Sequence, residues 1–304
     1  MRNTKIRLTP AAALPLAQLA ELINDTYQDY PIEVWFNMER LGRMCDHEDV
    51  DLERSVVAWV DDLPVGLALL SIRGRDGWVS GVGVRQAWRR RGIASRIIAR
   101  IQRLARHANL ARLRLEVLTQ NASAQILYRR AGFSVLRDLL VLVAEPDFGR
   151  PKASPDDVEV TDPKRLLSHF ERFHEVEPSW QRDHPSLAHR IDHLTGLGIW
   201  REGKLHGYLL AQRYTSTFHV LDIAVDPEAP KRLRIAGRLL AGLRSLAPTF
   251  SAHVINLPAD DPLAPAFREQ RYNVWQRQHE MAWSIPSDHQ EAADGGAKTG
   301  DEGD

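Results

Sequence analysis

The sequence has little of three features that mark other classes of protein. Cysteine occurs once, at Cys45, so no internal disulfide can form and a reducing, cytoplasmic environment is expected. The 40 Lys and Arg residues are balanced by 40 Asp and Glu residues, which argues against a nucleic-acid partner because such partners call for a basic excess. Residues 1–21 contain no long uncharged apolar run, so neither a signal peptide nor a membrane-spanning helix is predicted.

Common signatures of nucleotide, thiol and metal chemistry are also missing. The chain has no G-x-G-x-x-G and no G-K-[ST] pattern. Acidic neighbours in "MCDHEDVDLE" are expected to raise the pKa of Cys45, which disfavours a nucleophilic thiol. His189 and His193 have the spacing of a helical metal pair, but no Glu follows His189. Surface histidines are the preferred interpretation, and no metal site is predicted.

What is present is an ordinary globular composition with an internal asymmetry. The 304 residues, 43% of them hydrophobic, suffice for two domains. Residues 1–150 hold 22 basic against 17 acidic residues, a net charge of +5, and the remainder holds 18 against 23, a net charge of −5. Opposite charges suggest two units with different roles.

Hydrophobic periodicity predicts a mixed order of strands and helices in the first half. Strands are expected at 4–10, 77–84, 112–118 and 133–144, a hairpin at 55–73, and helices at 11–27, 92–108 and 121–132. The strand at 77–84 contains Gly77, Gly81 and Gly83. Glycine weakens a strand, so a bulge or a close backbone approach is expected there.

The second half repeats the first. Trp59 and Gly66 are seven residues apart, as are Trp200 and Gly207. Residues 93–105 align without a gap on 235–247, and 128–133 align on 267–272. Because the matches occur in the same order at similar offsets, two copies of one α+β unit are predicted. The predicted organisation is a domain at 1–145, a linker at 146–157, a second domain at 158–285 and a disordered tail at 286–304.

The stretch "WRRRGIAS" places three arginines and a glycine between a predicted strand and a predicted helix. The first N–H groups of a helix lack internal partners and attract anions, and Gly92 lets a phosphate approach the backbone. The pattern favours a pyrophosphate-bearing ligand. A solvated basic face is the alternative.

In its context this stretch resembles a known family. "GVGVRQAWRRRGIAS" is similar to the acetyl-CoA-binding segment of the GNAT (Gcn5-related) N-acetyltransferases, with Arg89, Gly92 and Ala94 filling the pattern Arg/Gln-x-x-Gly-x-Gly/Ala. "LEVLTQNASAQILYRRAGF" resembles the later strand-and-helix segment, most closely in the ribosomal-protein Nα-acetyltransferase branch. The resemblance implies an α+β fold of two tandem GNAT-like units, each a mixed, mostly antiparallel central sheet flanked by helices.

The resemblance also implies roles for individual residues. The backbone of the strand would pair with the pantetheine arm and polarise the thioester, and the following turn would bind the pyrophosphate. Asn121 would hold the pantetheine, Tyr128 would protonate the departing thiolate, and Glu116 would accept the proton of the attacking ammonium. The implied cofactor-binding residues are Val82, Gly83, Val84, Arg89, Arg90, Arg91, Gly92, Ile93, Ala94, Ser95 and Asn121.

The two catalytic assignments have structural alternatives. A base is needed because free amines near pKa 10 are mostly protonated at neutral pH. Glu116 is the only acidic residue between Gly77 and Asp138. It could instead be an ion-pair partner, with the base placed elsewhere or replaced by a water chain, and Tyr128 could be a core tyrosine.

The second copy differs at each of these positions. Arg234 stands where Gly92 stands, Phe267 where Tyr128 stands, Ile255 where Glu116 stands and Asp260 where Asn121 stands. These changes predict a degenerate copy that does not bind acetyl-CoA productively and that shapes the acceptor cleft.

The predicted function is a cytoplasmic, acetyl-CoA-dependent N-acetyltransferase that works by direct transfer in a ternary complex. The alternative is a non-catalytic acyl-CoA-binding or regulatory module. The acceptor is open between a small-molecule amine and a protein N-terminus, and the oligomeric state is open between a monomer and a homodimer. Acceptor specificity is expected in loops at 25–53, whose acidic part is either solvated or a mouth for cationic acceptors.

Overall fold

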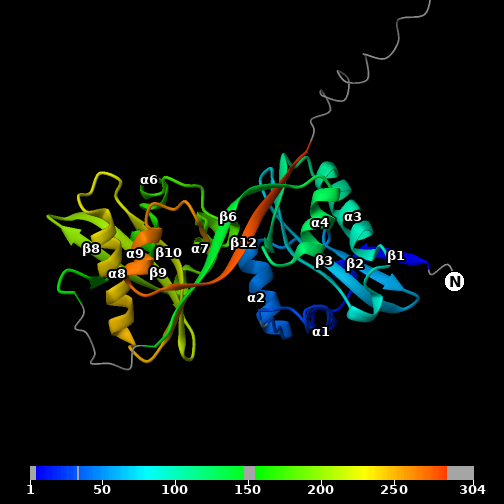
Figure 1. The fold of residues 1–304 in the computed structure, drawn as a ribbon, viewed down its shortest axis with the longest axis horizontal. Coiled ribbons are helices and arrows are strands. Elements are labelled where there is room, and N and C mark those ends of the chain that lie inside the picture. The colour runs from blue at the N-terminus through cyan, green and yellow to red at the C-terminus, as the bar shows by residue number, and fades with distance from the viewer. Residues whose placement is uncertain (1–4, 33, 147–154, 286–304) are drawn as a thin grey trace, which may run out of the picture. The chain divides into compact units, whose positions relative to one another are not determined.

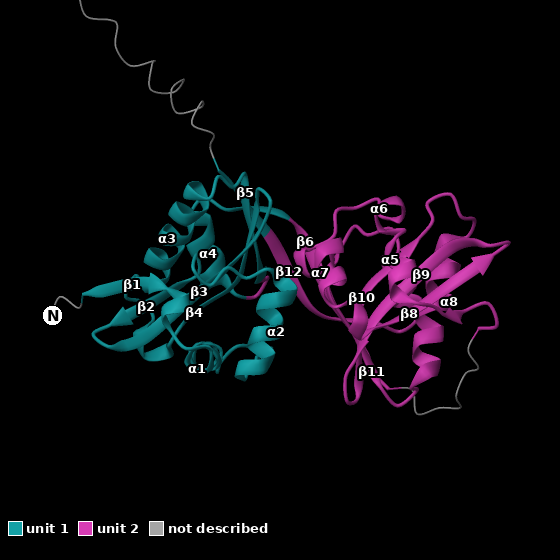
Figure 2. Ribbon diagram, turned by 180° about the vertical axis from the view of Figure 1, so that it is seen from behind, with its two compact units in different colours: residues 1–117, 121–136, 281–304 teal, residues 118–120, 137–280 magenta. Residues whose placement is uncertain are grey.

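The computed structural model describes residues 5–32, 34–146 and 155–285, which fall into two compact units (Figure 2). Unit 1 comprises residues 1–117, 121–136 and 281–304, and unit 2 comprises 118–120 and 137–280. The predicted tail at 286–304 and most of the predicted linker lie outside the described residues. Among the described residues, no helix combines the length and the apolar character needed to cross a membrane.

Unit 1 alternates strands and helices much as the periodicity predicts (Figure 1). Its elements are β1 (Ile6–Pro10), η1 (Ala11–Ala13), α1 (Leu16–Thr26), α2 (Met38–Glu48), β2 (Val56–Val60), β3 (Leu63–Arg73), β4 (Asp76–Val84), η2 (Gln86–Trp88), α3 (Ile93–His107), β5 (Arg112–Leu118), α4 (Ala122–Arg130) and the start of β6 (Ser134–Ala144). Strands β1 to β4 are antiparallel neighbours, and β5 joins β4 in parallel. The predicted strands and helices are thereby confirmed.

The sheet of unit 1 is covered on both faces (Figure 1). Because successive strand residues point to opposite faces, Val56, Ala58 and Leu70 pack with the isoleucines of α3, whereas Val57 and Leu67 pack under α1 and α2. The helices bury their apolar stripes in the same way. This sandwich of two helical layers places α1 and α4 on opposite faces of the same strands.

The region at 25–53, which was expected to be loop, contains the helix α2. Asn37 caps it by accepting a hydrogen bond from the backbone N–H of Arg40 at 2.8 Å. Asp49, in the acidic stretch at 46–53, forms an ion pair with Arg73 (Nε–Oδ2 2.5 Å). Part of the negative charge of this stretch is therefore neutralised within the unit. Burial, with Asp46 as a second cause, raises the pKa of Cys45 to about 11, in the predicted direction.

Unit 2 contains β7 to β12 and a second set of helices. Its elements are β7 (Glu159–Val160), α5 (Pro163–Leu167), α6 (Phe170–Phe173), η3 (Trp180–Arg182), α7 (His184–His189), η4 (Ile191–His193), β8 (Leu194–Arg201), β9 (Lys204–Arg213), β10 (Thr217–Val225), α8 (Arg232–Leu246), β11 (Ser251–Pro258), α9 (Ala264–Glu269) and most of β12 (Asn273–Ser284). The order from β2 to β6 in unit 1 recurs from β8 to β12.

The strand registers of the two units match residue by residue. Gly66 lies opposite Ala58 before a shift at Trp59, and Gly207 lies opposite Ile199 before a shift at Trp200. A Cβ at Gly66 would lie 2.8 Å from the carbonyl oxygen of Gly83, and one at Gly207 would lie 2.7 Å from a methyl of Ile235. The repeated Trp and Gly therefore mark the same bulged hairpin, which can carry no side chain at the glycine.

The boundary between the two compact units is not a single cut in the chain, because the units exchange the ends of the strands β6 and β12. The end of β6, from Arg137, belongs to unit 2, where it pairs antiparallel with β11. The end of β12, from Met281, belongs to unit 1, where Met281 is buried in the core beneath α3. Each unit thus includes the end of a strand that begins in the other.

Candidate active site

Two neighbouring strands of unit 1 separate at the predicted site. The parallel ladder between β4 and β5 joins Asp76 to Arg112 and ends at the pair Trp78 and Arg114, although both strands are described to their ends at Val84 and Leu118. A bulge at Ser80, between the pairs of Leu69 and Leu70 with β4, accompanies the separation. Beyond the ladder, backbone groups on the β5 side of β4 lose their strand partner, so they become available to other donors and acceptors.

At Val82, the phenol of Tyr27 forms hydrogen bonds with these backbone groups. Its hydroxyl accepts a hydrogen bond from the Val82 N–H at 3.2 Å and donates one to the Val82 carbonyl at 3.3 Å. Tyr27 follows α1 directly, and Tyr30 packs edge-on against it with ring centroids 5.1 Å apart. The open edge of β4 is therefore lined by α1 and the residues after it.

Two of the glycines of β4, Gly77 and Gly83, show the close approach that the sequence predicts. A Cβ at Gly83 would lie 2.1 Å from the hydroxyl oxygen of Thr26 on α1, and one at Gly77 would lie 2.5 Å from a methyl of Leu113. Gly83 and Gly77 are needed because a neighbouring element lies directly against the strand.

The turn between β4 and α3 has the backbone of an anion site. Arg90 and Gly92 both adopt the left-handed conformation, with φ of 63° and 76°, and Gly92 is the N-cap residue of α3. No side chain caps the helix, so the first N–H groups at Ile93, Ala94 and Ser95 are directed to the space around Gly92. Within the described residues, no heavy atom outside its neighbours lies within 4 Å of a Cβ built at Gly92.

The arginines of this turn have different tasks. The guanidinium of Arg89 bonds both carboxylate oxygens of Asp29, at 2.5 and 2.7 Å, and the carbonyls of Thr26 and Val84, at 3.0 and 2.9 Å. The pKa of Asp29 is lowered, chiefly by this hydrogen bond. Arg89 therefore ties the end of α1 to the turn, which leaves its side chain committed within the unit.

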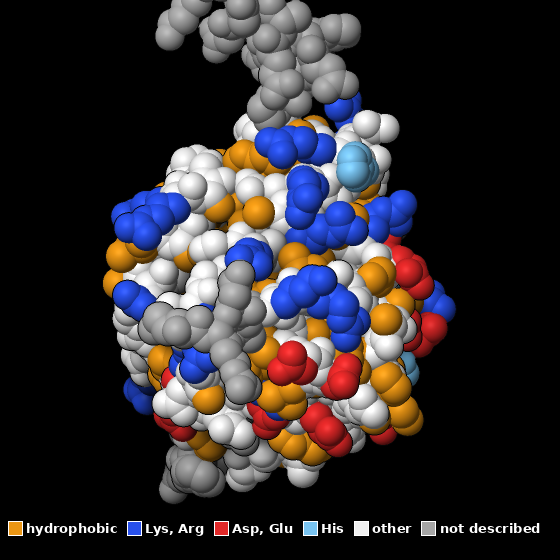
Figure 3. Space-filling model, turned by 90° about the vertical axis from the view of Figure 1, so that its right-hand side faces the viewer, with side chains coloured by type: hydrophobic (Ala, Val, Ile, Leu, Met, Phe, Trp, Pro, Cys, Tyr) orange, Lys and Arg blue, Asp and Glu red, His pale blue; other side chains and the backbone are white. Residues whose placement is uncertain are grey.

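Arg90 and Arg91 are exposed, and Arg91 lies over the ring of Trp88 with 4.7 Å to the centroid. Further exposed arginines follow on α3 and α4 at 96, 103, 106, 129 and 130. On the face of the molecule shown in Figure 3, Lys and Arg side chains gather in the upper part and Asp and Glu lie below them. Such a basic field attracts anionic ligands.

Asn121 caps α4. Its Oδ1 accepts hydrogen bonds from the Ala124 N–H at 3.1 Å and from the Ser123 hydroxyl at 3.0 Å. The cap fixes where α4 begins, and through it the position of Tyr128 two turns later.

Tyr128 is buried, with 7% of its surface exposed, and packs in the core beneath α3 and α4. Burial raises its pKa well above the ordinary tyrosine value, and the neighbouring phenols of Tyr27 and Tyr30 raise it further. Tyr128 comes from one face of the sheet and the other two from the opposite face. Tyr27 and Tyr30 are close enough to influence the pKa of Tyr128 in the region where β4 and β5 separate.

Glu116 lies on β5 beyond the end of the ladder, and its Oε2 accepts a hydrogen bond of 2.7 Å from the indole N–H of Trp78. The charge of Glu116 contributes to the raised pKa of Tyr30, after burial and Tyr27. The predicted base and the predicted acid therefore both act on the surroundings of one phenol, that of Tyr30.

Three residues of this cluster were not predicted from the sequence. Tyr27 and Tyr30 stand in a stretch without a recognisable motif, and Trp78 lies in the strand predicted at 77–84. The sole signal for them is the short spacing of Tyr27 and Tyr30 at the end of a predicted helix. Nothing in that spacing indicates which strand the phenols contact.

In unit 2 the corresponding gap between strands is filled by the chain itself. The parallel ladder of β10 and β11 ends at the pair Val220 and Val254. Beyond it, Ser179 donates to the carbonyl of Asn256 at 2.8 Å, and Arg182 donates to the carbonyl of Val220 at 3.1 Å. Ser179, Trp180 and Arg182 are at most 4% exposed. The segment 179–182 thus occupies the space that opens between the strands.

In unit 2, the positions aligned with Tyr128 and Glu116 have the same backbone hydrogen bonds and strand register, but their side chains cannot act as an acid or a base. The carbonyl of Tyr128 accepts the N–H of Phe133, and that of Phe267 accepts the N–H of Tyr272. Trp78 pairs with Arg114 and His219 with His253, which places Ile255 in the register of Glu116. The aligned positions therefore carry a phenyl ring and an aliphatic chain.

The turn before α8 also differs from the turn before α3. The buried residues Ile235, Leu239 and Leu240 of α8 match Ile93, Ile97 and Ile98 of α3, yet α8 begins at Arg232 and α3 at Ile93. α8 therefore has one additional turn at its start. Arg234 lies inside this additional helical turn. The sequence alignment had placed it at the position of Gly92, in an open turn before the helix.

Comparisons with known proteins agree with this architecture. Residues 16–133 match the model described as the Acetyltransferase (GNAT) family. Among proteins with curated functions, none matches the chain. A GCN5-related N-acetyltransferase from Sphaerobacter thermophilus is similar in structure, with a TM-score of 0.71 and 16% identity over 93% of this chain and 96% of that one.

Two other solved structures are similar over comparable lengths. A putative acetyltransferase from Pyrococcus horikoshii has a TM-score of 0.64 and 16% identity, over 94% of this chain and 91% of that one. A tandem GNAT protein from the clavulanic acid biosynthesis pathway, solved without acetyl-CoA, has a TM-score of 0.67 and 15% identity, over 93% of this chain and 100% of that one. At these identities the similarity shows the fold, so the predicted fold class is confirmed: the chain has the mixed α/β architecture of the GNAT proteins, with a mostly antiparallel sheet flanked by helices.

Proposed function

We propose that the protein is an acetyl-CoA-dependent N-acetyltransferase whose single active site lies in unit 1. The observation that carries the proposal is the separation of β4 and β5 next to an uncapped, glycine-started helix. The separation offers a strand edge to an extended arm, and the helix start offers N–H groups to a pyrophosphate. The family match at 16–133 covers both features.

The residues of unit 1 fit acetyl-CoA as a co-substrate. The open space at Gly92 admits a phosphate to the N–H groups of Ile93, Ala94 and Ser95, and Arg90 and Arg91 add exposed positive charge. Val82 to Val84 would present backbone groups to the pantetheine, and Asn121 would contact it from the start of α4. Arg89 contributes by fixing the turn, since its guanidinium is held by Asp29.

The two catalytic groups have complementary environments. Glu116, oriented by the indole of Trp78, would take a proton from the acceptor ammonium, directly or through water. Tyr128 keeps its phenolic proton because burial and its tyrosine neighbours raise its pKa, so it could deliver that proton to the departing thiolate. The acetyl group would pass directly from sulfur to nitrogen, with no group of the chain acylated on the way.

Unit 2 would not bind acetyl-CoA productively. Its strand gap is filled by the segment 179–182, and Phe267 and Ile255 supply neither an acid nor a base.

The proposal is tested by ligand-induced thermal stabilisation and by acetylation. Saturating acetyl-CoA is expected to raise Tm by mass action, and a library of primary amines, with peptides carrying free N-termini, is expected to contain an acetylated acceptor detected by mass spectrometry. Stabilisation without acetylation of any amine would favour a non-catalytic acyl-CoA-binding module. No stabilisation at saturation would exclude both.

Replacing Glu116 with Gln is expected to lower kcat/KM at pH 7 by about 100-fold, the scale of a lost general base. The amide still accepts the indole hydrogen bond of Trp78, so acetyl-CoA affinity and Tm should remain close to wild type. Raising the pH should restore part of the rate, because more acceptor amine is then neutral. An unchanged kcat/KM at pH 7 would assign the base elsewhere.

Replacing Tyr27 with Phe is expected to tighten acetyl-CoA binding several-fold. The hydroxyl of Tyr27 holds both backbone groups of Val82, which the pantetheine would need, and each such bond contributes about 1 kcal/mol. Tm without ligand should fall slightly for the same reason. Calorimetric titration measures the affinity, and weaker binding would show that Tyr27 supports the cofactor and does not compete with it.

A further inference from the structure

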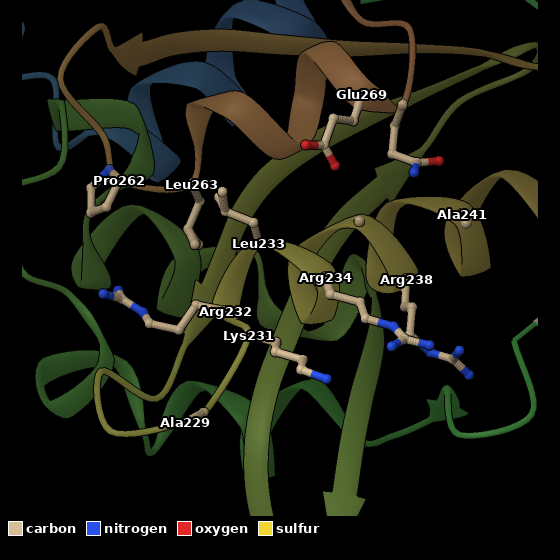
Figure 4. A pocket seen from close by; sticks show the side chains of 12 residues that line it. Ala229, Lys231, Arg232, Leu233, Arg234, Arg238, Ala241, Pro262, Leu263 and Glu269 are labelled. Carbon is tan, nitrogen blue, oxygen red and sulfur yellow. The ribbon is translucent and has the colours of Figure 1, made fainter.

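A cavity in unit 2 lies outside the candidate active site. It is formed between α8 and α9 (Figure 4) and has a volume of about 790 Å³, within the range of small-molecule sites. Its walls are the first turns of α8, the turn before that helix, and the residues at both ends of α9.

One wall of the cavity is basic. Arg234 and Arg238 are four residues apart on one face of α8, and Lys231 immediately precedes the helix as its N-cap residue. Figure 4 shows their charged ends turned to the same side, with Arg232 turned to the other side. Glu269, on α9, is the single acidic residue of the lining.

The charges of this stripe are only partly compensated. Arg238 pairs with Asp157 (Nε–Oδ1 2.6 Å), which holds its guanidinium in place. Within the part of the chain that the structure describes, Lys231 and Arg234 have no carboxylate at ion-pair distance. Like charges on one helical face repel each other, and a bound anion would relieve that repulsion.

Beside the basic wall the lining has an apolar part, and Arg232 and Gln270 are its other polar residues. Leu233 is 36% exposed, and Pro262 and Leu263 lie across from it before α9 (Figure 4). A basic stripe beside an apolar wall suits a ligand that has phosphates at one end and a flat or apolar group at the other.

The site is not a copy of the turn in unit 1. Lys231 replaces glycine at the left-handed position, with φ of 57°, and the extra turn of α8 replaces the open loop. The segment 179–182 fills the gap between β10 and β11, so no long arm can extend from the cavity along β10. The ligand must therefore be short.

We propose that this cavity binds a small nucleotide. Its phosphates lie against Lys231, Arg234 and Arg238, and its base packs on Leu233, Pro262 and Leu263. The site binds without catalysis, and it is independent of acetyl transfer in unit 1.

The test is calorimetric titration of the full chain with ADP. Saturable binding is expected, weakened by added salt, and the double variant Lys231→Ala/Arg234→Ala should weaken it at least tenfold. Arg268→Ala removes an exposed charge of α9 that does not line the cavity, so it should leave ADP binding unchanged. Circular dichroism and Tm confirm that each variant is folded.

Three results would overturn the proposal. They are no ADP binding to the wild-type chain at millimolar concentration, equal binding to the wild type and the double variant, and loss of binding on Gly92→Asp but not in the double variant. The last result would place the ADP at the turn of unit 1. Inorganic pyrophosphate as a second probe shows whether the base contributes, since it lacks the group that packs on the apolar wall.

Discussion

Gly92→Asp is expected to weaken acetyl-CoA binding by about 100-fold or more. A carboxylate at the start of α3 would stand beside the pyrophosphate, and two like charges about 5 Å apart near a protein surface repel by about 3 kcal/mol. The side chain has space, because no other atom among the described residues lies within 4 Å of a Cβ at this position, but the φ of 76° strains any residue that has a Cβ. Calorimetric titration with acetyl-CoA measures the loss directly.

Two controls separate this charge effect from the cost of the backbone. Gly92→Asn has the same shape and the same left-handed conformation without the charge, and it should lose much less affinity than Asp. Gly203 has the same φ of 76° and equally open space, but it lies in the turn between β8 and β9 of unit 2. Gly203→Asp should leave acetyl-CoA binding unchanged. Equal losses for Asn and Asp at position 92 would show that the glycine matters for conformation alone.

Tyr128→Phe is expected to reduce kcat by about 100-fold or more while acetyl-CoA affinity changes little. The variant removes the phenolic proton and keeps the ring, and a general acid contributes on this scale. Phe267 shows that phenylalanine fits the aligned position, where its ring lies 5.3 Å from that of Tyr272. A wild-type kcat in this variant would remove Tyr128 from the mechanism.

Tyr272→Phe is the matched control, since it deletes the hydroxyl of the paired ring in unit 2. That hydroxyl is buried, and it finds no hydrogen-bond partner among the described residues. The variant should therefore be at least as stable as wild type, with unchanged turnover. Loss of turnover in both variants would indicate a general effect of the aromatic cores.

The pH dependence follows from the same burial. The pKa of Tyr128 in the folded protein is raised above the ordinary value of 10.0, so the neutral phenol persists as the pH passes that value. The wild-type rate should show no loss assignable to this acid below pH 10. The contribution of Tyr128 to the free energy of unfolding is complete below the pKa of the phenol in the unfolded chain. It decreases at higher pH, because the phenol ionises more readily in the unfolded chain than in the folded protein.

Local features of unit 1 followed from the sequence because they depend on neighbouring residues. The isoleucines of α3 recur at helical spacing, the hairpin turns at Asp61, and Gly92 stands between a strand and a helix. Each of these patterns acts over a few residues through backbone conformation and a single apolar face. The repeat of Trp59 and Gly66 at Trp200 and Gly207 was visible for the same reason.

Contacts between distant residues were decided only by the tertiary structure. Tyr27 is hydrogen-bonded to Val82, 55 residues away, and Arg89 to Asp29, 60 residues away. No local pattern in the sequence predicts either pairing. The helix α2 was missed because its apolar residues are few, and its single fully buried leucine is Leu41.

The sequence by itself determined the strands and helices of unit 1 other than α2, the glycine turn before α3, and Tyr128 and Glu116 as candidates. The tertiary structure decided that Thr26 is why Gly83 is a glycine, that Arg89 is committed to Asp29, and that the segment 179–182 fills the gap of unit 2. The reason is physical. Backbone conformation depends mainly on near neighbours, whereas the residues that fill the space beside a strand come from segments far away in the sequence.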